Sequence, residues 1–214
     1  MWKTHHCYVG VTFSGVGAVL TFSFDSMPLH LPINITLTGC TFLEGALLRF
    51  VGGAEAAESA GIQIRVTQTV MRSSVVAFVL AFPQHCDIAV TEVDVVQFSE
   101  VHLPDARRNK LSVLLLMNVV LSASSLLVSN VNAHATNRDA FGLYSTGTLT
   151  LVRGSSLYAR YCSFEGYEYL FYVYRLSVSD HSCFCAAQQY NVLRGKPAVS
   201  APRIQRVGSK RVAR

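Results

Sequence analysis

Short segments in which apolar and polar residues alternate recur along this chain of 214 residues. An alternating apolar triplet followed by threonine occupies residues 33–38 and returns at 62–67 and 86–91. A period of two places every second side chain on one face, and it predicts half-buried β-strands. Weaker copies of the same pattern lie at 111–115, 149–151 and 176–178.

The copies repeat at a nearly regular spacing. Their central residues are Ile35, Ile64, Ile88, Val113, Leu151 and Val178. The first four are separated by 29, 24 and 25 residues, and the last two by 27. A longer gap of 38 residues precedes Leu151 and contains the apolar stretch 126–131, which we interpret as a shortened rung.

A second apolar run follows the first strand of a copy, as at 46–51, 74–82 and 169–174. A β-solenoid needs two or three short strands per turn of about 25 residues, because its strands lie parallel and each coil pairs with the next. We therefore predict an all-β chain, a right-handed parallel β-helix of roughly six coils, with the six central residues stacked on its inward side.

Charge divides the chain into two parts. Residues 1–182 hold 11 Lys and Arg against all 13 Asp and Glu, whereas residues 183–214 hold 7 basic residues and no acid. The overall composition, 50% apolar and 14% charged, excludes a wholly disordered protein. We predict a β-helix repeat region over 1–182 and a disordered basic tail over 183–214. Binding of the tail to nucleic acid or an anionic membrane is the alternative, but no nucleic-acid partner is expected.

Two uncharged stretches raise the question of membrane insertion. Residues 4–24 follow Lys3, yet their apolar residues alternate with Thr and Ser, unlike the continuous run of a signal peptide. Residues 111–129 are nearly long enough to span a bilayer but contain Asn118 and five serines. We interpret 111–129 as two buried strands with a Ser-rich turn, and insertion of either stretch stays open.

Six cysteines are scattered without a CxxC pair or a histidine pair at zinc spacing, so neither a metal site nor another cofactor is predicted. The triplet Asn34-Ile35-Thr36 is a sequon that accepts a glycan if the chain is secreted. Secretion would also oxidise at least some of the cysteines.

Four segments closely resemble the trypanosome dispersed gene family, which consists of very large, repetitive surface proteins. They read GALLRFVGGAEAAESAG, LAFPQHCDIAVTEVD, LLMNVVLSASSLLVSNVNAHA and GLYSTGTLTLVRGSSLYARYCSFEGY. The resemblance implies a pectin-lyase-like parallel β-helix, glycosylation, and a cell-surface or secreted location, with a membrane anchor only in regions that this chain lacks. It also implies adhesion to host-cell or matrix glycoproteins. Because family members are far longer, we interpret the chain as a fragment or truncated copy, and loss of function in that copy is an alternative.

The alternative activity for a β-helix is polysaccharide lysis or hydrolysis, which needs two or three converging carboxylates. The densest acidic group is Asp87, Glu92, Asp94 and Glu100. Glu92 and Asp94 share strand parity, but a corner near Thr91 would make them ordinary outward residues that alternate with inward valines. His85 and Cys86 are adjacent and point to opposite faces, so they form no catalytic dyad. We predict a protein that is not an enzyme.

Aromatic residues concentrate at 158–174. The candidate binding-face residues are Tyr158, Tyr161, Tyr167, Tyr169 and Tyr172. Aromatic side chains are enriched at carbohydrate and protein interfaces, yet they also form core ladders in stacked sheets. Both interpretations stay open from the sequence.

Overall fold

The computed structural model describes residues 4–15, 17–53, 57–97, 111–135, 140–167, 169–187 and 190–192, almost all of them in β-strands and tight turns. A single 3₁₀ turn, η1 (Phe24–Ser26), interrupts the strands in these ranges. The strands form two sheets in which every pair is parallel. The predicted all-β chain of parallel strands is therefore confirmed.

The large sheet contains eleven strands. They are β1 (Thr4–Val9), β2 (Thr12–Ser14), β4 (Ile33–Thr38), β5 (Thr41–Leu43), β7 (Ile62–Arg72), β9 (Cys86–Gln97), β11 (Ser125–Ala135), β13 (Ser156–Arg160), β14 (Ser163–Glu165), β16 (Cys183–Ala187) and β17 (Tyr190–Val192). The small sheet contains six strands. They are β3 (Val19–Ser23), β6 (Leu47–Val51), β8 (Val75–Ala81), β10 (Leu111–Ser122), β12 (Ala140–Val152) and β15 (Tyr169–Val178).

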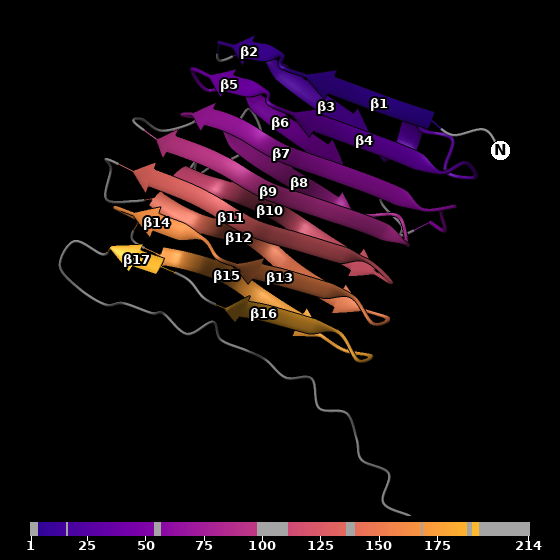
Figure 1. Cartoon of the computed structure of the whole chain (residues 1–214). Helices are drawn as coiled ribbons and strands as arrows, with labels where there is room; N and C mark the ends of the chain where they lie inside the picture. The colour runs from indigo at the N-terminus through magenta and orange to yellow at the C-terminus, as the bar shows by residue number, and fades with distance from the viewer. Residues whose placement is uncertain are drawn as a thin grey trace, which may run out of the picture.

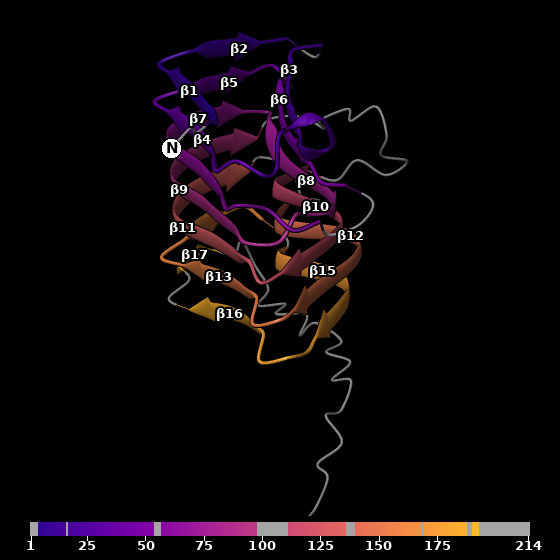
Figure 2. The same cartoon turned by 90° about the vertical axis from the view of Figure 1, so that its right-hand side faces the viewer.

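The chain alternates between the two sheets. Within each sheet, a strand pairs with the corresponding strand of the preceding and following repeats, in the orders β1-β4-β7-β9-β11-β13-β16 and β3-β6-β8-β10-β12-β15. We call the large-sheet strands of one repeat, with the small-sheet strand that follows them, a level. Figures 1 and 2 show the levels stacked from β1 and β2 at one end to β16 and β17 at the other. The inward side chains of both sheets form one continuous hydrophobic core.

Register aligns the inward residues of successive levels. Ile35, Ile64 and Ile88 lie directly opposite one another and are fully buried, as predicted. Their column continues through Leu126 and Leu157 of β11 and β13.

The second half of the predicted column is wrong. Val113, Leu151 and Val178 belong to β10, β12 and β15 of the small sheet. The stretch 126–131, interpreted as a shortened rung, lies in β11 and carries the large-sheet column instead. The prediction rested on spacing, and β10 follows Ile88 at an interval similar to those between the large-sheet strands. Its apolar residues also alternate as in a large-sheet strand. Periodicity alone does not identify the sheet to which a strand belongs.

A corner divides the large sheet lengthwise. At this corner, one residue in each of the first six levels has a left-handed backbone, with φ between 51° and 64°. These residues are Gly10, Gly39, Gln68, Glu92, Asn130 and Tyr161. The turn inserts one residue that resets the in-out alternation, so Val90 and Val93 are both buried on either side of it. The predicted corner near Thr91 is confirmed, one residue later at Glu92.

Residues 111–135 form β10 and β11 with a turn at Ala123 and Ser124, which confirms two strands joined by a Ser-rich turn. No helix within the described ranges is long and apolar enough to cross a membrane. The predicted boundary after residue 182 is too early, because β16 and β17 follow it and pair with β13 and β14. Cys183–Ala187 precedes Arg194, the first basic residue of the predicted tail, and forms an uncharged strand. The rest of the predicted tail, 193–214, lies outside the described residues.

Candidate functional site

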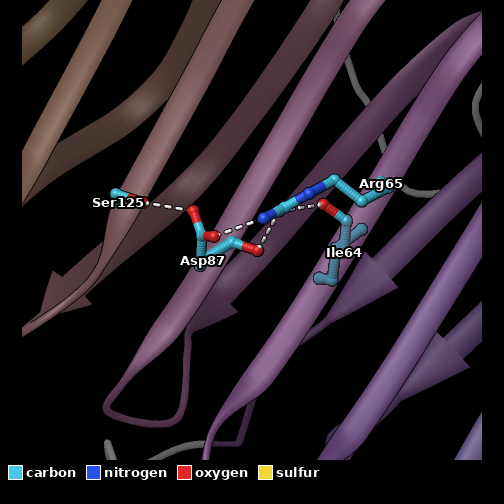
Figure 3. A network of polar contacts seen from close by, with 4 residues as sticks. All are labelled: Ile64, Arg65, Asp87 and Ser125. Atoms are coloured by element: carbon cyan, nitrogen blue, oxygen red, sulfur yellow. Dashed lines mark hydrogen bonds and ion pairs between the residues drawn. The ribbon is translucent and has the colours of Figure 1, made fainter.

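A polar network crosses three neighbouring strands on the outer face of the large sheet (Figure 3). Arg65 of β7 forms an ion pair with the Asp87 carboxylate of β9 through Nη2. Its Nη1 donates to the main-chain carbonyls of Asp87, at 2.9 Å, and Ile64, at 3.1 Å. The Ser125 hydroxyl of β11 donates to Asp87 Oδ1 at 2.7 Å. Parallel register places Ser125 directly opposite Asp87 and Arg65 opposite Ala89, two residues further along, so Asp87 is held from both neighbouring strands.

The network keeps Asp87 ionised. Partial burial raises the pKa of its carboxyl, but the hydrogen bonds from Arg65 and Ser125 and the charge of Arg65 outweigh burial, so the pKa is lowered. Both members of the ion pair are about half exposed. An exposed pair of this kind contributes at most about 1 kcal/mol to stability. The arrangement is that of a surface brace between strands.

An open depression of about 370 Å³ lies beside this network. Its polar lining comes from His85, Cys86, Asp87, Ser124, Ser125 and Ser156. Burial raises the pKa of the Cys86 thiol to about 12, although a hydrogen bond with Ser124 lowers it in part. The thiol donates to the carbonyl of Pro83 at 3.0 Å. Cys86 is therefore protonated at neutral pH and unsuited to nucleophilic attack.

Within the described residues, the acidic side chains named above do not converge on one site. Glu92 and Asp94 are exposed, while Val93 and Val95 between and beyond them are buried, which confirms that the two acids are outward residues of an alternating strand. Glu100 lies outside the described residues. Within the described ranges, no three His, Cys, Asp or Glu side chains gather as metal ligands would.

The tyrosines predicted as one binding face lie on different surfaces. Tyr158 of β13 and Tyr161 at the corner are 43% and 47% exposed on the large sheet. Tyr172 is half-buried in β15 of the small sheet. Tyr167 is only 2% exposed and is packed edge-on against Phe164, with ring centroids 5.4 Å apart.

The single binding face is therefore corrected to two exposed tyrosines, because the chain leaves the large sheet after β14 and crosses to the small one. The side chain of Tyr169 lies outside the described residues. Tyr174, which the sequence did not single out, is 67% exposed on β15. Tyr172 and Tyr174 share strand parity, so alternation along β15 does not predict that one is half-buried and the other exposed.

Arg160 completes the exposed cluster on the large sheet. Its guanidinium carbon lies 5.8 Å from the centroid of the Tyr161 ring, within the range of a cation–π contact. Tyr158 and Arg160 share parity on β13 and point outward. We call Tyr158, Arg160 and Tyr161 the Tyr–Arg patch. Both tyrosines of the patch were predicted from the sequence, but Arg160 was not. Its spacing of two residues from Tyr158 could have indicated that the two side chains share a face.

The other sequence candidates lie apart from this patch. Asn34 is an outward, half-exposed residue near the start of β4. All six cysteines carry free thiols, three of them buried, so the expected oxidation stays a prediction. The buried thiols of Cys40 and Cys162 donate to main-chain carbonyls beside the corner.

Comparison with known proteins adds one finding. No curated protein and no solved structure matches the chain. A family model described as the DGF-1 beta-sheet domain matches residues 34–189, nearly three quarters of the chain. The match includes β16, which extends the family region past the predicted boundary at 182. The parallel strands described above, from β4 to β16, thus fall within this domain, and the chain belongs to the dispersed gene family, DGF-1.

Proposed function

We propose that this chain is a segment of a right-handed, pectin-lyase-like parallel β-helix from a surface or secreted protein, and that it binds host-cell or matrix glycoproteins without chemical turnover. Family membership supports the surface-type assignment. Two parallel sheets visited in alternation support the helical winding, because parallel connections are nearly always right-handed.

The Tyr–Arg patch is the observation that carries the binding proposal. Tyrosine and arginine are the residue types that dominate binding hot spots, since they offer large contact areas and several hydrogen-bond donors. Here both tyrosines are exposed on a sheet whose backbone is paired on both sides. The Tyr158 hydroxyl also accepts a hydrogen bond from the Cys183 thiol at 3.3 Å, which favours one orientation of the ring. A patch held in this way loses little conformational entropy on binding.

The test is retention of purified protein on a panel of matrix glycoproteins and polyuronates. The double variant Tyr158→Ala/Arg160→Ala should lose at least about tenfold in affinity, as expected for a pair of hot-spot residues. Tyr174→Ala removes a more exposed tyrosine from the small sheet and should bind like the wild type. Equal losses in both variants would contradict a patch on the large sheet.

The same panel tests for catalysis. Release of soluble product from a polyuronate, abolished by Glu92→Gln, would replace the adhesin by a polysaccharide-active enzyme. Retention without product supports the binding proposal. Failure of the folded protein to be retained by any member of the panel would count against it and favour a truncated copy without function.

A surface or secreted location also predicts that Asn34 carries a glycan. The sequon lies on the outer side of β4, between His5 and Gln63 of the neighbouring strands, so the folded sheet leaves its side chain half exposed. Protein isolated from its native cell should shift in mobility after endoglycosidase treatment. Thr36→Ser preserves the sequon and should keep the shift, whereas Thr36→Ala should abolish it. An unshifted wild type would contradict passage through the secretory route.

A further inference from the structure

The core is incompletely covered at both ends of the stack. Residues in the middle, such as Leu48 and Ile64, are fully buried. Several inward apolar residues of the outermost described strands are only partly buried. They are Tyr8, Phe13 and Leu20 at one end, and Phe171, Val178 and Phe184 at the other. Each end therefore presents an apolar surface that one more level would cover.

The outermost strands also have an unpaired edge. Within the described residues, β1 pairs only with β4, and β16 pairs only with β13. An open edge presents backbone N–H and C=O groups to another strand. Val9, an outward residue at the end of β1, is 68% exposed beside this open edge.

Register places two exposed cysteines in one column. Cys7 of β1 lies opposite Thr36, and the same outward column passes down the large sheet to Tyr158 and then Cys185 of β16. Its intermediate members are Arg65, Ala89 and Leu127. Both thiols are free and exposed. The two ends of the stack thus carry a thiol at the same position along the strand.

We propose that copies of this chain stack end to end, with β16 of one copy alongside β1 of the next, and that a disulfide between Cys185 and Cys7 locks the contact. A continued parallel register would place these residues opposite each other, about 4.8 Å apart. Disulfides join residues whose Cα atoms lie about 4.4–6.8 Å apart, so the spacing suits the bond. The same contact would cover the partly buried residues at both ends.

The locking step is a thiol–disulfide exchange with a small disulfide such as oxidised glutathione. The Cys7 thiolate attacks one glutathione sulfur, breaks its S–S bond, and releases one glutathione thiolate. The Cys185 thiolate of the adjacent copy then attacks the Cys7 sulfur and releases the second. Two protein thiols are oxidised, one small disulfide is reduced to two thiols, and the protons are taken up by the released thiolates and solvent.

The contact uses two different surfaces and therefore does not close on itself. Each added copy presents a fresh edge, so the product is a chain of copies and not a symmetric dimer. The inference depends on the observed register and the exposed ends, and it holds whether or not the Tyr–Arg patch binds a glycoprotein.

The experiment incubates the full chain, purified under reducing conditions, with oxidised glutathione and separates the products on non-reducing gels. Wild type should give a ladder of dimers, trimers and longer species that reductant collapses, with a Cys7–Cys185 peptide identified by mass spectrometry. Cys7→Ser and Cys185→Ser should each lose the ladder. In an equal mixture of the two variants, Cys185 of Cys7→Ser can bond to Cys7 of Cys185→Ser. The resulting dimer has neither Cys7 nor Cys185 at its outer ends, so no longer species should form.

Cys183→Ser is the matched control. Cys183 is on β16 in the neighbouring outward column, opposite Ser156, and its replacement should leave the ladder intact. A ladder that survives in Cys7→Ser, a dimer formed by Cys185→Ser alone, or a wild type that stays monomeric would each overturn the proposal. The last outcome is expected if residues 193–214 or another chain occupies the end in place of a second copy.

Discussion

Two ladders of side chains run along different parts of the stack, each through three successive levels, and they differ in chemistry. The first joins three phenylalanines inside the small sheet, where neighbouring rings stack 5.4 and 5.1 Å apart between Phe22, Phe50 and Phe78. The second joins serines at the turns that lead from the small sheet into the large one. The apolar ladder lies in the middle of strands, whereas the polar ladder lies where strands begin.

The serine ladder satisfies backbone groups at the turn. The N–H groups of Cys86, Ser124 and Ser155 donate to the next serine hydroxyl along the stack, at 3.0, 3.1 and 3.0 Å. The hydroxyls of Ser124 and Ser155 in turn donate to the carbonyls of Ser122 and Val152. A left-handed residue precedes Cys86 and each of these two serines, so the regular ladder of main-chain bonds is interrupted there.

The difference shows what each site requires of its side chain. In the middle of a strand the backbone is already paired, so a large apolar ring that fills the core is stabilising. At the turn, a buried N–H without a partner costs more than an apolar side chain gains, so a small hydroxyl that both accepts and donates is favoured. Each requirement recurs over three successive levels of the stack.

Removing a ring from the apolar ladder should have the largest effect. Phe50→Ala leaves a cavity between two stacked rings and should lower the free energy of unfolding by about 3–5 kcal/mol. Urea unfolding followed by far-ultraviolet circular dichroism measures this change. Phe50→Leu keeps most of the volume and should cost less than about 1.5 kcal/mol. Equal costs for both variants would show that ring stacking, and not volume, stabilises the column.

Removing a hydroxyl from the polar ladder should have the second-largest effect on stability. Ser155→Ala removes the acceptor for the Ser124 N–H and should cost about 1–3 kcal/mol, because a buried donor is left without its partner. Ser156→Ala, one residue later on the outer side, should change the free energy of unfolding by less than about 0.5 kcal/mol. Amide hydrogen exchange at Ser124 should also become faster in Ser155→Ala and remain slow in Ser156→Ala. Unchanged exchange would contradict the role given to this hydroxyl.

Strand identity could be predicted from the sequence because alternation in a parallel sheet is a local property. Ile35, Ile64 and Ile88 were assigned to one inward column correctly, since their repeats are free of long insertions. Val113 was assigned to the wrong sheet, because the 38-residue interval between Ile88 and Leu126 is filled by a strand of the same pattern. Register between distant strands depends on which strands pair, and spacing alone does not contain that information.

The corners were harder to predict than the strands. Gly10 and Gly39 are typical residues for a left-handed backbone, but Gln68 and Tyr161 occupy the same position and carry no such signal. Their conformation is imposed by the levels above and below, which pair on both sides of the turn. The arrangement of the candidate site could not be predicted for the same reason. The corner at Tyr161 and the crossover after β14 separate tyrosines that are close in sequence.

The outer polar network should show the smallest effect. Its members are about half exposed, so Asp87→Asn should cost less than about 1 kcal/mol at pH 7. The pKa of Asp87 is lowered from its ordinary value of 3.8, so its ionised form stabilises the fold. This contribution is complete above pH 3.8 and is lost as pH falls through the lower pKa of the folded state.

The difference in unfolding free energy between wild type and Asp87→Asn should therefore shrink as pH falls from 7 towards about 2.5. Ser125→Ala removes one of the hydrogen bonds and keeps the ion pair with Arg65, so it should produce only part of the change. It also replaces serine by alanine as Ser155→Ala does, but on the outer side, and should cost less. A difference that grows on acidification would mean that Asp87 stabilises the sheet in its protonated form. A larger cost for Ser125→Ala than for Ser155→Ala would reverse the order given to the inner and outer hydroxyls.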